Sequence, residues 1–589
     1  MEGKEIEVLQ MESSNTTIKK CRLGRLRKPR AHIPPDNEHQ SFICCLTGLY
    51  SCQWKWNQRN TVERGHWCCG AGECTFFLLV CLAFCLWFIF LYLWGEIKND
   101  YHSFDWYNYG NFGFWFHWST LFLIIAAIIF SYLLFLLILA VCLISESQRL
   151  YLHWSHKIVM VFALSLSFLA IAMVTLLWSK QWNTFCLSFQ VTAPFLHIVA
   201  IFIMILLAWP VALHFFWINN KVVQVLIILP YLAILLFLLF IPLGMYSPCI
   251  LEKGALGPKP SLIGHRGAPM VAPENTEMSF KKAVAYGAIG FETDVTISFD
   301  GVPFLMHDST LKRTTNVEDV YPKGSRQLAA FFPWEYLENL NSGNWFFQNR
   351  PFFEMPSLSP EDKILARNQR IYQLTDLLKL AKQENKFVIF DLYRPPKSHP
   401  YRDTWISRTA ELVQNEMGNK SHLVLWLEDL DRSTVQNIAP GFQQTSGIAH
   451  PVKDLQKRNI VKLNLDYREM NRVDIWKYAR ANITSNFWVV SEPWLFSLAW
   501  CSGAHSVTTD AIHSLGSVHH PFFFLTPKEY RSMWIVTDVM AVLLIAFLFS
   551  IHWWREVGRF CCEGESHTTI NSDPYHVSET ELGTMPTVV

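Results

Sequence analysis

The chain contains few charged residues, and their charges nearly cancel. Asp, Glu, Lys and Arg together make up 17% of its 589 residues, whereas soluble domains contain about 25%. The formal net charge of +1 gives no electrostatic basis for binding nucleic acid. The shortage of charge instead indicates that part of the chain lies in lipid.

Charged residues are missing altogether from five long apolar segments, and a sixth segment contains only Asp538. Each segment reaches the ~20 residues that a helix needs to cross the hydrocarbon of a bilayer. A transporter or channel is disfavoured by the same shortage, because transport pathways usually use ionisable groups, and His197 and Asp538 are the exceptions here. The predicted membrane helices are Thr75–Gly95, Ser119–Ile144, Ile158–Ser179, Gln190–Leu213, Val222–Met245 and Trp534–Trp554.

A secretory signal peptide is also missing, because the N-terminal region is polar and basic and has no short apolar core. Seven Lys and Arg between residues 19 and 30 favour a cytosolic N-terminus, and six spans return the C-terminus to the cytosol. We expect a plasma-membrane protein whose long polar block lies outside the cell or in a lumen. The predicted layout is a cytosolic basic arm at 1–74, five membrane helices at 75–245, an outside domain at 246–530, a sixth membrane helix at 534–554 and a cytosolic tail at 555–589.

Glycosylation sequons agree with this orientation. Those at Asn419 and Asn482 fall in the predicted outside domain, whereas the sequon at Asn15 falls on the cytosolic side and should stay unused. The outside domain contains only two cysteines, Cys249 and Cys501, which form either one disulfide or two buried thiols.

The C-terminal residues Thr587-Val588-Val589 have the spacing and the free carboxylate that PDZ domains bind. A PDZ-domain partner at Val589 is therefore predicted beside the two partners that the rest of the sequence implies, the lipid bilayer and a substrate.

The block at 257–525 has roughly the ~250 residues of a (β/α)8 barrel. Short apolar runs alternate with helical patterns along it, which favours a parallel sheet. The predicted fold is a multi-pass α-helical membrane protein with an extracellular α/β domain of the TIM-barrel type, and an open doubly wound sheet is the alternative. Residues 318–370 are irregular and are predicted to form an insertion or a lid. The predicted strands are Ser261–Gly264, Phe291–Phe299, Phe387–Leu392, Leu423–Leu427, Val461–Leu465, Phe487–Val490 and Ser506–Thr509.

Two carboxylates stand one residue apart on a predicted strand, at Glu292 and Asp294. Residues i and i+2 of a strand point to the same face, so both carboxylates can bind one hard cation. The Asp300-Gly301 pair next along the chain is typical of a two-residue hairpin turn. Such a turn would place His307 opposite Asp294, provided that Pro303 occupies an edge strand.

His265 and Arg266 directly follow the first predicted strand, where a barrel collects its catalytic groups. Arginine offers a planar set of donors that matches phosphate oxygens. Two imidazoles can act as general base and general acid near neutral pH, and a divalent cation can neutralise charge that develops on a phosphoryl group. Together these residues indicate the cleavage of a phosphodiester.

Several motifs in this region resemble the signature of the glycerophosphodiester phosphodiesterase family. A weaker similarity extends to Trp488 and to Thr509-Asp510, so the resemblance covers about residues 258–515. The five helices before the domain and the one after it are similar to the six-transmembrane branch of that family. The motifs are Gly264-His265-Arg266-Gly267, Pro273-Glu274-Asn275-Thr276, Glu292-x-Asp294 and His307-Asp308.

The resemblance implies a TIM-barrel hydrolase that cleaves glycerophosphodiesters, such as glycerophosphocholine and glycerophosphoinositol, or the glycosylphosphatidylinositol anchors of cell-surface proteins. Some members first form a cyclic phosphate with the substrate's own glycerol hydroxyl. By resemblance, the acid/base pair is His265 and His307, the phosphate ligand is Arg266, the metal ligands include Glu292 and Asp294, and the supporting residues include Glu274 and Trp488.

One departure from the family pattern concerns its Glu-x-Lys motif, which appears here as Asp391-Leu392-Tyr393. Asp391 keeps the charge of the third metal ligand on a shorter side chain, and Ca²⁺ tolerates irregular oxygen geometry better than Mg²⁺ does. We therefore expect one divalent cation, Ca²⁺ rather than Mg²⁺. Because Tyr393 lacks the positive charge, a catalytically weak barrel that binds a lipid headgroup or a protein is the alternative function.

Overall fold

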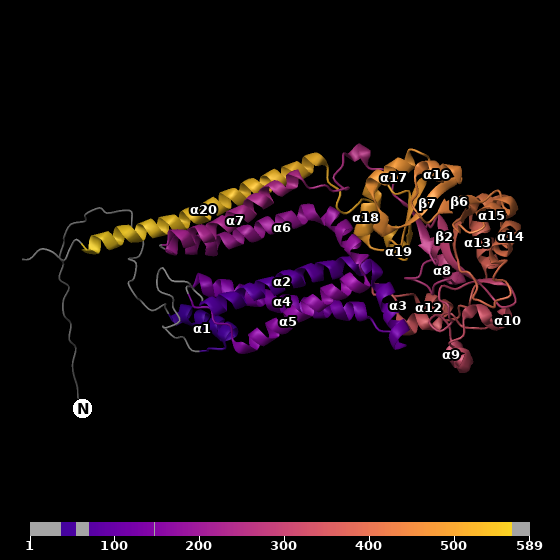
Figure 1. Cartoon of the computed structure of the whole chain (residues 1–589), viewed down its shortest axis with the longest axis horizontal. Helices are drawn as coiled ribbons and strands as arrows, with labels where there is room; N and C mark the ends of the chain where they lie inside the picture. Colours follow the sequence, from indigo (N-terminus) through magenta and orange to yellow (C-terminus); the bar gives the residue numbers. More distant parts are fainter. Residues whose placement is uncertain (1–36, 55–69, 147, 219, 568–589) are drawn as a thin grey trace, which may run out of the picture.

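The structure is a computed structural model that describes residues 37–54, 70–146, 148–218 and 220–567 (Figure 1). The basic cluster, the sequon at Asn15 and the C-terminal Val589 lie outside these residues. A bundle of long helices occupies one half of the molecule and an α/β barrel the other. Helix α1 (Asn37–Ser51) and the C-terminal end of α20 lie at the end of the bundle that is away from the barrel.

Six helices of the described chain are long and apolar enough to cross a membrane, and they coincide with the six predicted spans. The chain is therefore a multi-pass membrane protein. Helix α2 packs against α4 and α5, while α6 packs against α7 and α20. The sequence did not predict α1 or the short helix α3 (Tyr101–Phe112), which continues from the outer end of α2 through a 3-10 turn. The six helices are α2 (Ala71–Glu96), α4 (Trp118–Ser145), α5 (Trp154–Leu177), α6 (Gln181–Trp217), α7 (Lys221–Phe240) and α20 (Pro527–His567).

Eight parallel strands form a closed barrel, because β1 pairs with both β2 and β9. This closure confirms the TIM-type fold and rejects the open sheet. The sequence missed β6 because its Gln-Gln-Thr-Ser run has no apolar pattern; its buried polar groups are satisfied by partners such as Arg432, whose Nη1 donates to Gln444 Oε1 at 2.8 Å. The strands are β1 (Ser261–His265), β2 (Gly290–Ile297), β4 (Phe387–Leu392), β5 (Val424–Trp426), β6 (Gln443–Ser446), β7 (Ile460–Asp466), β8 (Thr484–Trp488) and β9 (Ser506–Thr509), with β3 (Pro303–Leu305) added at the edge.

A helix follows each parallel strand and covers the outside of the barrel. Helix α13 illustrates the reason: its buried residues recur with the spacing of one helix face and pack against the strands. The predicted insertion at 318–370 contains four further short helices, α9 (Val317–Val320), α10 (Trp334–Leu337), α11 (Asn344–Asn349) and α12 (Pro360–Arg367). The barrel helices are α8 (Glu277–Ala285), α13 (Leu374–Glu384), α14 (Trp405–Met417), α15 (Arg432–Ile438), α16 (Val452–Lys457), α17 (Arg472–Ala479), α18 (Pro493–Ser502) and α19 (Ile512–Leu515).

The hairpin after β2 corrects the predicted pairing. Val295 pairs with Leu305, and the amide of Met306 donates to the carbonyl of Asp294 at 3.0 Å, so Met306 rather than His307 lies opposite Asp294. The turn has three residues instead of two and ends at Gly301, whose φ of +90° suits glycine. Pro303 does lie on the edge strand β3, as the hairpin requires.

A disulfide between Cys249 and Cys501 joins the segment before β1 to helix α18, with 2.02 Å between the sulfur atoms. This bond resolves the alternative that the sequence left open between one disulfide and two thiols.

The carboxyl end of the barrel faces the helix bundle. Asn99, in the connection between α2 and α4, donates from Nδ2 to the carbonyl of Val489 at 2.9 Å and accepts from the amide of Ser491 at 2.8 Å. Tyr467 donates from its hydroxyl to Asp100 Oδ2 at 2.8 Å. The mouth of the barrel is therefore fixed against the nearer ends of the membrane helices.

Candidate active site

The predicted site residues come together at the mouth of the barrel. His265 ends β1, Glu292 and Asp294 lie on β2, Asp391 lies on β4 and Trp488 ends β8. The carboxyl ends of parallel strands meet at one rim, which is where TIM barrels place catalytic groups.

A carboxylate fixes the orientation of His265. Its Nδ1 lies 2.6 Å from Asp510 Oδ1, just after β9, and its Nε2 lies 3.8 Å from Glu292 Oε2. Because an ionised carboxylate only accepts hydrogen bonds, Nδ1 is the donor and Nε2 is left for a reacting proton. Burial lowers the pKa of His265, but the negative charges of Asp510 and Glu292 and the hydrogen bond to Asp510 together outweigh burial and raise it.

His307 has the same arrangement with a different partner. Its Nδ1 lies 2.8 Å from Asp308 Oδ1, and Asp308 accepts from Arg313 Nε at 2.8 Å. Burial would raise the pKa of Asp308, but Arg313 holds it well below its usual range. Asp308 is therefore an anion that can hold the imidazole, as Asp510 does for His265.

Arg266 belongs to a buried network of alternating charges. Its Nη1 donates to Glu274 at 3.1 Å, and its Nε lies 3.1 Å from Asp294 Oδ2. Glu274 also accepts from both terminal nitrogens of Arg313, at 2.6 and 2.9 Å. Burial would raise the pKa of Glu274, but the two arginines lower it far more. Arg266, Glu274 and Arg313 thus form one network that ends at the His307–Asp308 pair.

The loop after β1 has the backbone that this network needs. Arg266 and Asn275 adopt left-handed conformations, with φ of +51° and +55°. Only glycine fits at position 267, because a Cβ there would lie 2.4 Å from Ser279 Oγ. Thr276 then caps helix α8 by accepting from the amide of Ser279. The loop is held in one shape, so Arg266 points into the mouth.

The acidic residues of the mouth influence one another. Burial raises the pKa of Glu292, and Asp294 and Asp391 raise it further. Burial would raise the pKa of Asp294, but Arg266 and His307 lower it. The pKa of Asp391 is raised by burial and by Asp294, its neighbour across the β2–β4 register.

Tyr393 occupies the position where the family pattern has lysine, and its hydroxyl donates to Asp294 Oδ1 at 3.0 Å. Asn275 Nδ2 donates to Asp294 Oδ2, also at 3.0 Å. Both oxygens of Asp294 therefore have partners within the chain.

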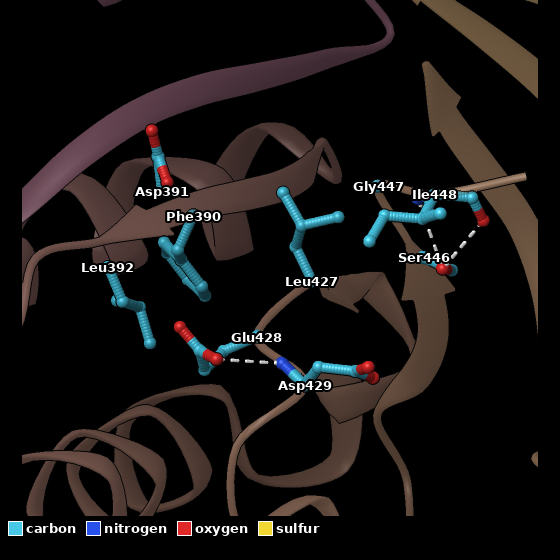
Figure 2. A pocket seen from close by; sticks show the side chains of 9 residues that line it. All are labelled: Phe390, Asp391, Leu392, Leu427, Glu428, Asp429, Ser446, Gly447 and Ile448. Carbon is cyan, nitrogen blue, oxygen red and sulfur yellow. Dashed lines mark hydrogen bonds between the residues drawn. The ribbon is translucent and has the colours of Figure 1, made fainter.

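The carboxylates fit a hard divalent cation in the type of donor atom and in charge. All three offer oxygen, and a cation would offset the repulsion that raises the pKa of Glu292 and Asp391. In the described part of the chain, no three His, Cys, Asp or Glu side chains enclose a common point. Figure 2 shows the carboxyl groups of Asp391 and Glu428 well apart, with Phe390 between them. An ion bound by Glu292, Asp294 and Asp391 would share the oxygens of Asp294 with their partners in the chain, which are Tyr393, Asn275 and Arg266.

The remaining predicted residues lie as follows. Trp488 is 40% exposed and lines the pocket at the mouth of the barrel, together with His265, Arg266 and Asp510. Asn419 and Asn482 are exposed on the outside of the barrel. Sequence reasoning assigned no role to Asp510 and missed Arg313. The partner of Asp510 is 245 residues away in the chain, and Arg313 follows the His307-Asp308 motif by a spacing that has no meaning until the loop is folded.

This geometry defines a class of protein. It is the geometry of a phosphodiester hydrolase. The mouth of the TIM barrel brings together two imidazoles held by carboxylates, an arginine and a group of acids. The chain belongs to the glycerophosphoryl diester phosphodiesterase family, whose model matches residues 265–423. Members of this family generally depend on a divalent metal ion.

Known proteins resemble the chain over most of its length. It is 43% identical over 518 residues to glycerophosphodiester phosphodiesterase domain-containing protein 5 of Homo sapiens, covering 88% of this chain and 84% of that protein. It is 39% identical over 505 residues to a glycerophosphoinositol inositolphosphodiesterase of Homo sapiens, covering 86% and 92%. Among solved structures, it resembles a phosphodiesterase of Oleispira antarctica in complex with sn-glycerol-3-phosphate, with 19% identity, a TM-score of 0.36, and coverage of 44% of this chain and 96% of that one.

Proposed function

We propose that the chain is a metal-dependent phosphodiesterase of the cell surface whose site is formed by His265, His307 and Arg266. The observation that carries the proposal is that Asp510 and Asp308 each hold Nδ1 of one histidine beside the arginine–carboxylate network. In each imidazole, Nε2 is then left for a reacting proton.

The two imidazoles divide the proton transfers. One accepts the proton of the attacking hydroxyl, which comes from water or from the substrate's own glycerol, and the other donates a proton to the leaving oxygen. Asp510 and Asp308 stabilise the imidazolium forms that arise in turn. Arg266 offers donors to the phosphate oxygens, and Glu274 keeps its guanidinium in place.

A divalent cation would be held by Glu292, Asp294 and Asp391 and would neutralise charge on the phosphoryl group. Ca²⁺ suits this set better than Mg²⁺, because Asp391 is short and Ca²⁺ accepts irregular coordination.

The orientation proposed is the one that the sequence predicts, with both termini in the cytosol, residues 246–530 outside and the protein in the plasma membrane. The exposed sequons at Asn419 and Asn482 support it. Treatment with a glycosidase should increase the mobility of the wild-type chain on a gel and leave Asn419→Gln/Asn482→Gln unchanged. An unglycosylated wild type whose barrel is protected by intact cells would overturn this orientation. A PDZ-domain partner at Val589 stays a prediction, tested by pull-down with and without the last residue.

The proposed substrates are glycerophosphodiesters such as glycerophosphocholine and glycerophosphoinositol, or glycosylphosphatidylinositol anchors. The relative named glycerophosphoinositol inositolphosphodiesterase supports the first group. The mouth pocket, with a volume of about 120 Å³, is lined by polar residues that include His265, Arg266 and Asp510, which suits a compact phosphate-bearing headgroup.

The test is hydrolysis by the purified full chain. Glycerophosphocholine, glycerophosphoinositol and an anchored protein are offered with Ca²⁺, with Mg²⁺ or with a chelator, and the products are identified. Activity that disappears on chelation and returns with Ca²⁺ supports the proposal. Hydrolysis that is indifferent to chelation would reject the metal.

The alternative is a barrel that binds a lipid headgroup or a protein without turnover. It is favoured by Tyr393, which replaces a cation and occupies an oxygen of Asp294. Binding of a headgroup without release of any product would support this alternative.

A further inference from the structure

The connection between membrane helices α2 and α4 forms one wall of the catalytic pocket. Asn99, Asp100, His102 and Ser103 line the same pocket as His265 and the arginine of the mouth. Trp106 of helix α3 packs edge-on against His307, with 5.5 Å between ring centroids, and its Nε1 donates to Asp308 at 3.4 Å. The pocket is thus shared between the barrel and the membrane domain.

His102 is a residue of this wall that contacts the barrel insertion. Its ring stacks on Phe352 of the barrel insertion, with 4.3 Å between centroids and 13° between planes. The bonds that Asn99 and Asp100 make to the barrel lie two or three residues away and fix the start of helix α3. His102 therefore has a defined position.

The Nε2 atom of His102 is buried and has no hydrogen-bond partner in the described chain. A buried polar atom without a partner is unfavourable in a native structure, and each instance needs a physical explanation. His102 lines the pocket beside Arg266. A turn of the ring about its Cβ–Cγ bond, which keeps it stacked on Phe352, would expose this nitrogen to the pocket, where a ligand oxygen would be its partner.

The surroundings decide the charge of the ring. Burial lowers the pKa of His102 to about 4, and the nearby Arg313 acts in the same direction. A neutral imidazole has one N–H, and an anionic ligand favours the tautomer that places this hydrogen on Nε2. The ring can then donate to a phosphate without adding a third positive charge beside Arg266 and Arg313.

We propose that His102 binds a phosphate oxygen of the substrate through Nε2, so that the membrane domain contributes a substrate-binding residue to the barrel's active site. This inference rests on the proposed phosphodiesterase function. It assigns the substrate phosphate to the space between Arg266 and the α2–α4 connection.

The test compares two variants of the full chain, His102→Phe and His102→Gln. Phenylalanine keeps the ring stacked on Phe352 but has no nitrogen, whereas glutamine keeps a donor and loses the ring. Asn111→Ala, an exposed position on the same helix α3, is the matched control. Two quantities are measured, the KM for glycerophosphocholine and the affinity for glycerol 3-phosphate by calorimetry.

His102→Phe is expected to weaken both quantities by about 10- to 100-fold, the effect of losing a hydrogen bond to a charged group. Its kcat should stay within about threefold, because the same bond is present in the ground state and the transition state. His102→Gln should recover part of the affinity, and Asn111→Ala should behave like the wild type. Affinities of His102→Phe within twofold of the wild type, or equal losses in both His102 variants, would overturn the inference.

The two measurements separate the inference from the proposed function. A wild type that hydrolyses no diester contradicts the phosphodiesterase proposal, but calorimetry still reports whether His102 binds the phosphate. A wild type that is active together with an unaffected His102→Phe contradicts only the role of His102.

Discussion

The mouth of the barrel and its interior both contain buried polar residues, but they use them differently. The mouth contains full charges in a chain from Asp308 through Arg313 and Glu274 to Arg266. The interior layer consists mainly of neutral groups that form hydrogen bonds with one another; its residues are Lys462, Asn464, Asn486, Ser506 and Thr508. Asn486 Nδ2 donates to Asn464 at 2.6 Å and to Thr508 at 2.9 Å. Ser506 Oγ donates to Asn486 at 2.8 Å.

The difference suggests that the mouth serves catalysis and that the interior layer serves the stability of the barrel. In the interior layer each donor of Asn486 has an acceptor, so this layer has nothing to offer a ligand. At the mouth, the hydrogen bonds that the two histidines form with described residues use Nδ1, and the acids repel one another. Changes at the mouth should therefore reduce activity, and changes in the interior layer should reduce stability.

The largest effect is expected from His307→Ala. The loss of one of the two proton-transfer groups should lower kcat by about 10²- to 10⁴-fold, the usual contribution of general acid–base catalysis. Asp308→Asn should have a smaller effect, because it keeps the imidazole and only weakens its orientation. Steady-state hydrolysis of glycerophosphocholine measures both, and activity of His307→Ala near that of the wild type would remove this residue from the site.

Arg313→Met should affect activity and stability together. Its side chain is only 1% exposed and lies between Glu274 and Asp308, so removing the cation leaves these buried carboxylates with Arg266 and His307 as partners. Breaking a buried ion pair costs about 3–5 kcal/mol. Thermal unfolding of the full chain in detergent should show the loss, with Arg313→Lys intermediate; an unchanged melting temperature would show that the network does not support the mouth.

Asn486→Ala should lower stability alone. The substitution removes the donor to Asn464 Oδ1 and Thr508 Oγ1 and the acceptor of Ser506 Oγ, which should cost about 2–3 kcal/mol. The KM for glycerophosphocholine should stay unchanged below the unfolding temperature. A selective loss of activity without a loss of stability would contradict the separation of the two regions.

The smallest effect is expected from Lys462, whose pKa is lowered to about 8 by burial. In the unfolded chain the pKa is near 10.5, so below pH 8 the buried cation costs its full amount, and the cost disappears as the pH rises through this window. Between pH 8 and about 9.5, the wild type should gain on the order of 1–2 kcal/mol relative to Lys462→Met. Melting temperatures of both chains across the window measure this, and parallel curves would contradict it.

The sequence predicted the local features of both regions and little of their tertiary pairing. Six apolar runs predicted the six spans because length and lack of charge decide membrane insertion. Barrel closure could not be predicted, because it depends on β1 pairing with β9 across more than 240 residues. The hairpin register was wrong by one residue because the sequence does not distinguish a three-residue turn at Asp300-Gly301 from a two-residue turn.

The site shows the same limit. His265, Arg266, Glu274 and His307 could be proposed from the sequence because their motifs are local in the chain. The partner of His265, Asp510, and the wall residue His102 come from distant segments, and only the folded chain brings them to the mouth.

The most direct test compares two histidines at opposite ends of the barrel, His265 at the mouth and the exposed His505 just before β9. Hydrolysis of glycerophosphocholine by the full chain is measured for His265→Ala and for His505→Ala. A loss of at least about 10²-fold in the first, with activity within about twofold of the wild type in the second, is the expected result. Equal activity in the two variants would contradict the assignment of the catalytic site to the membrane-facing mouth.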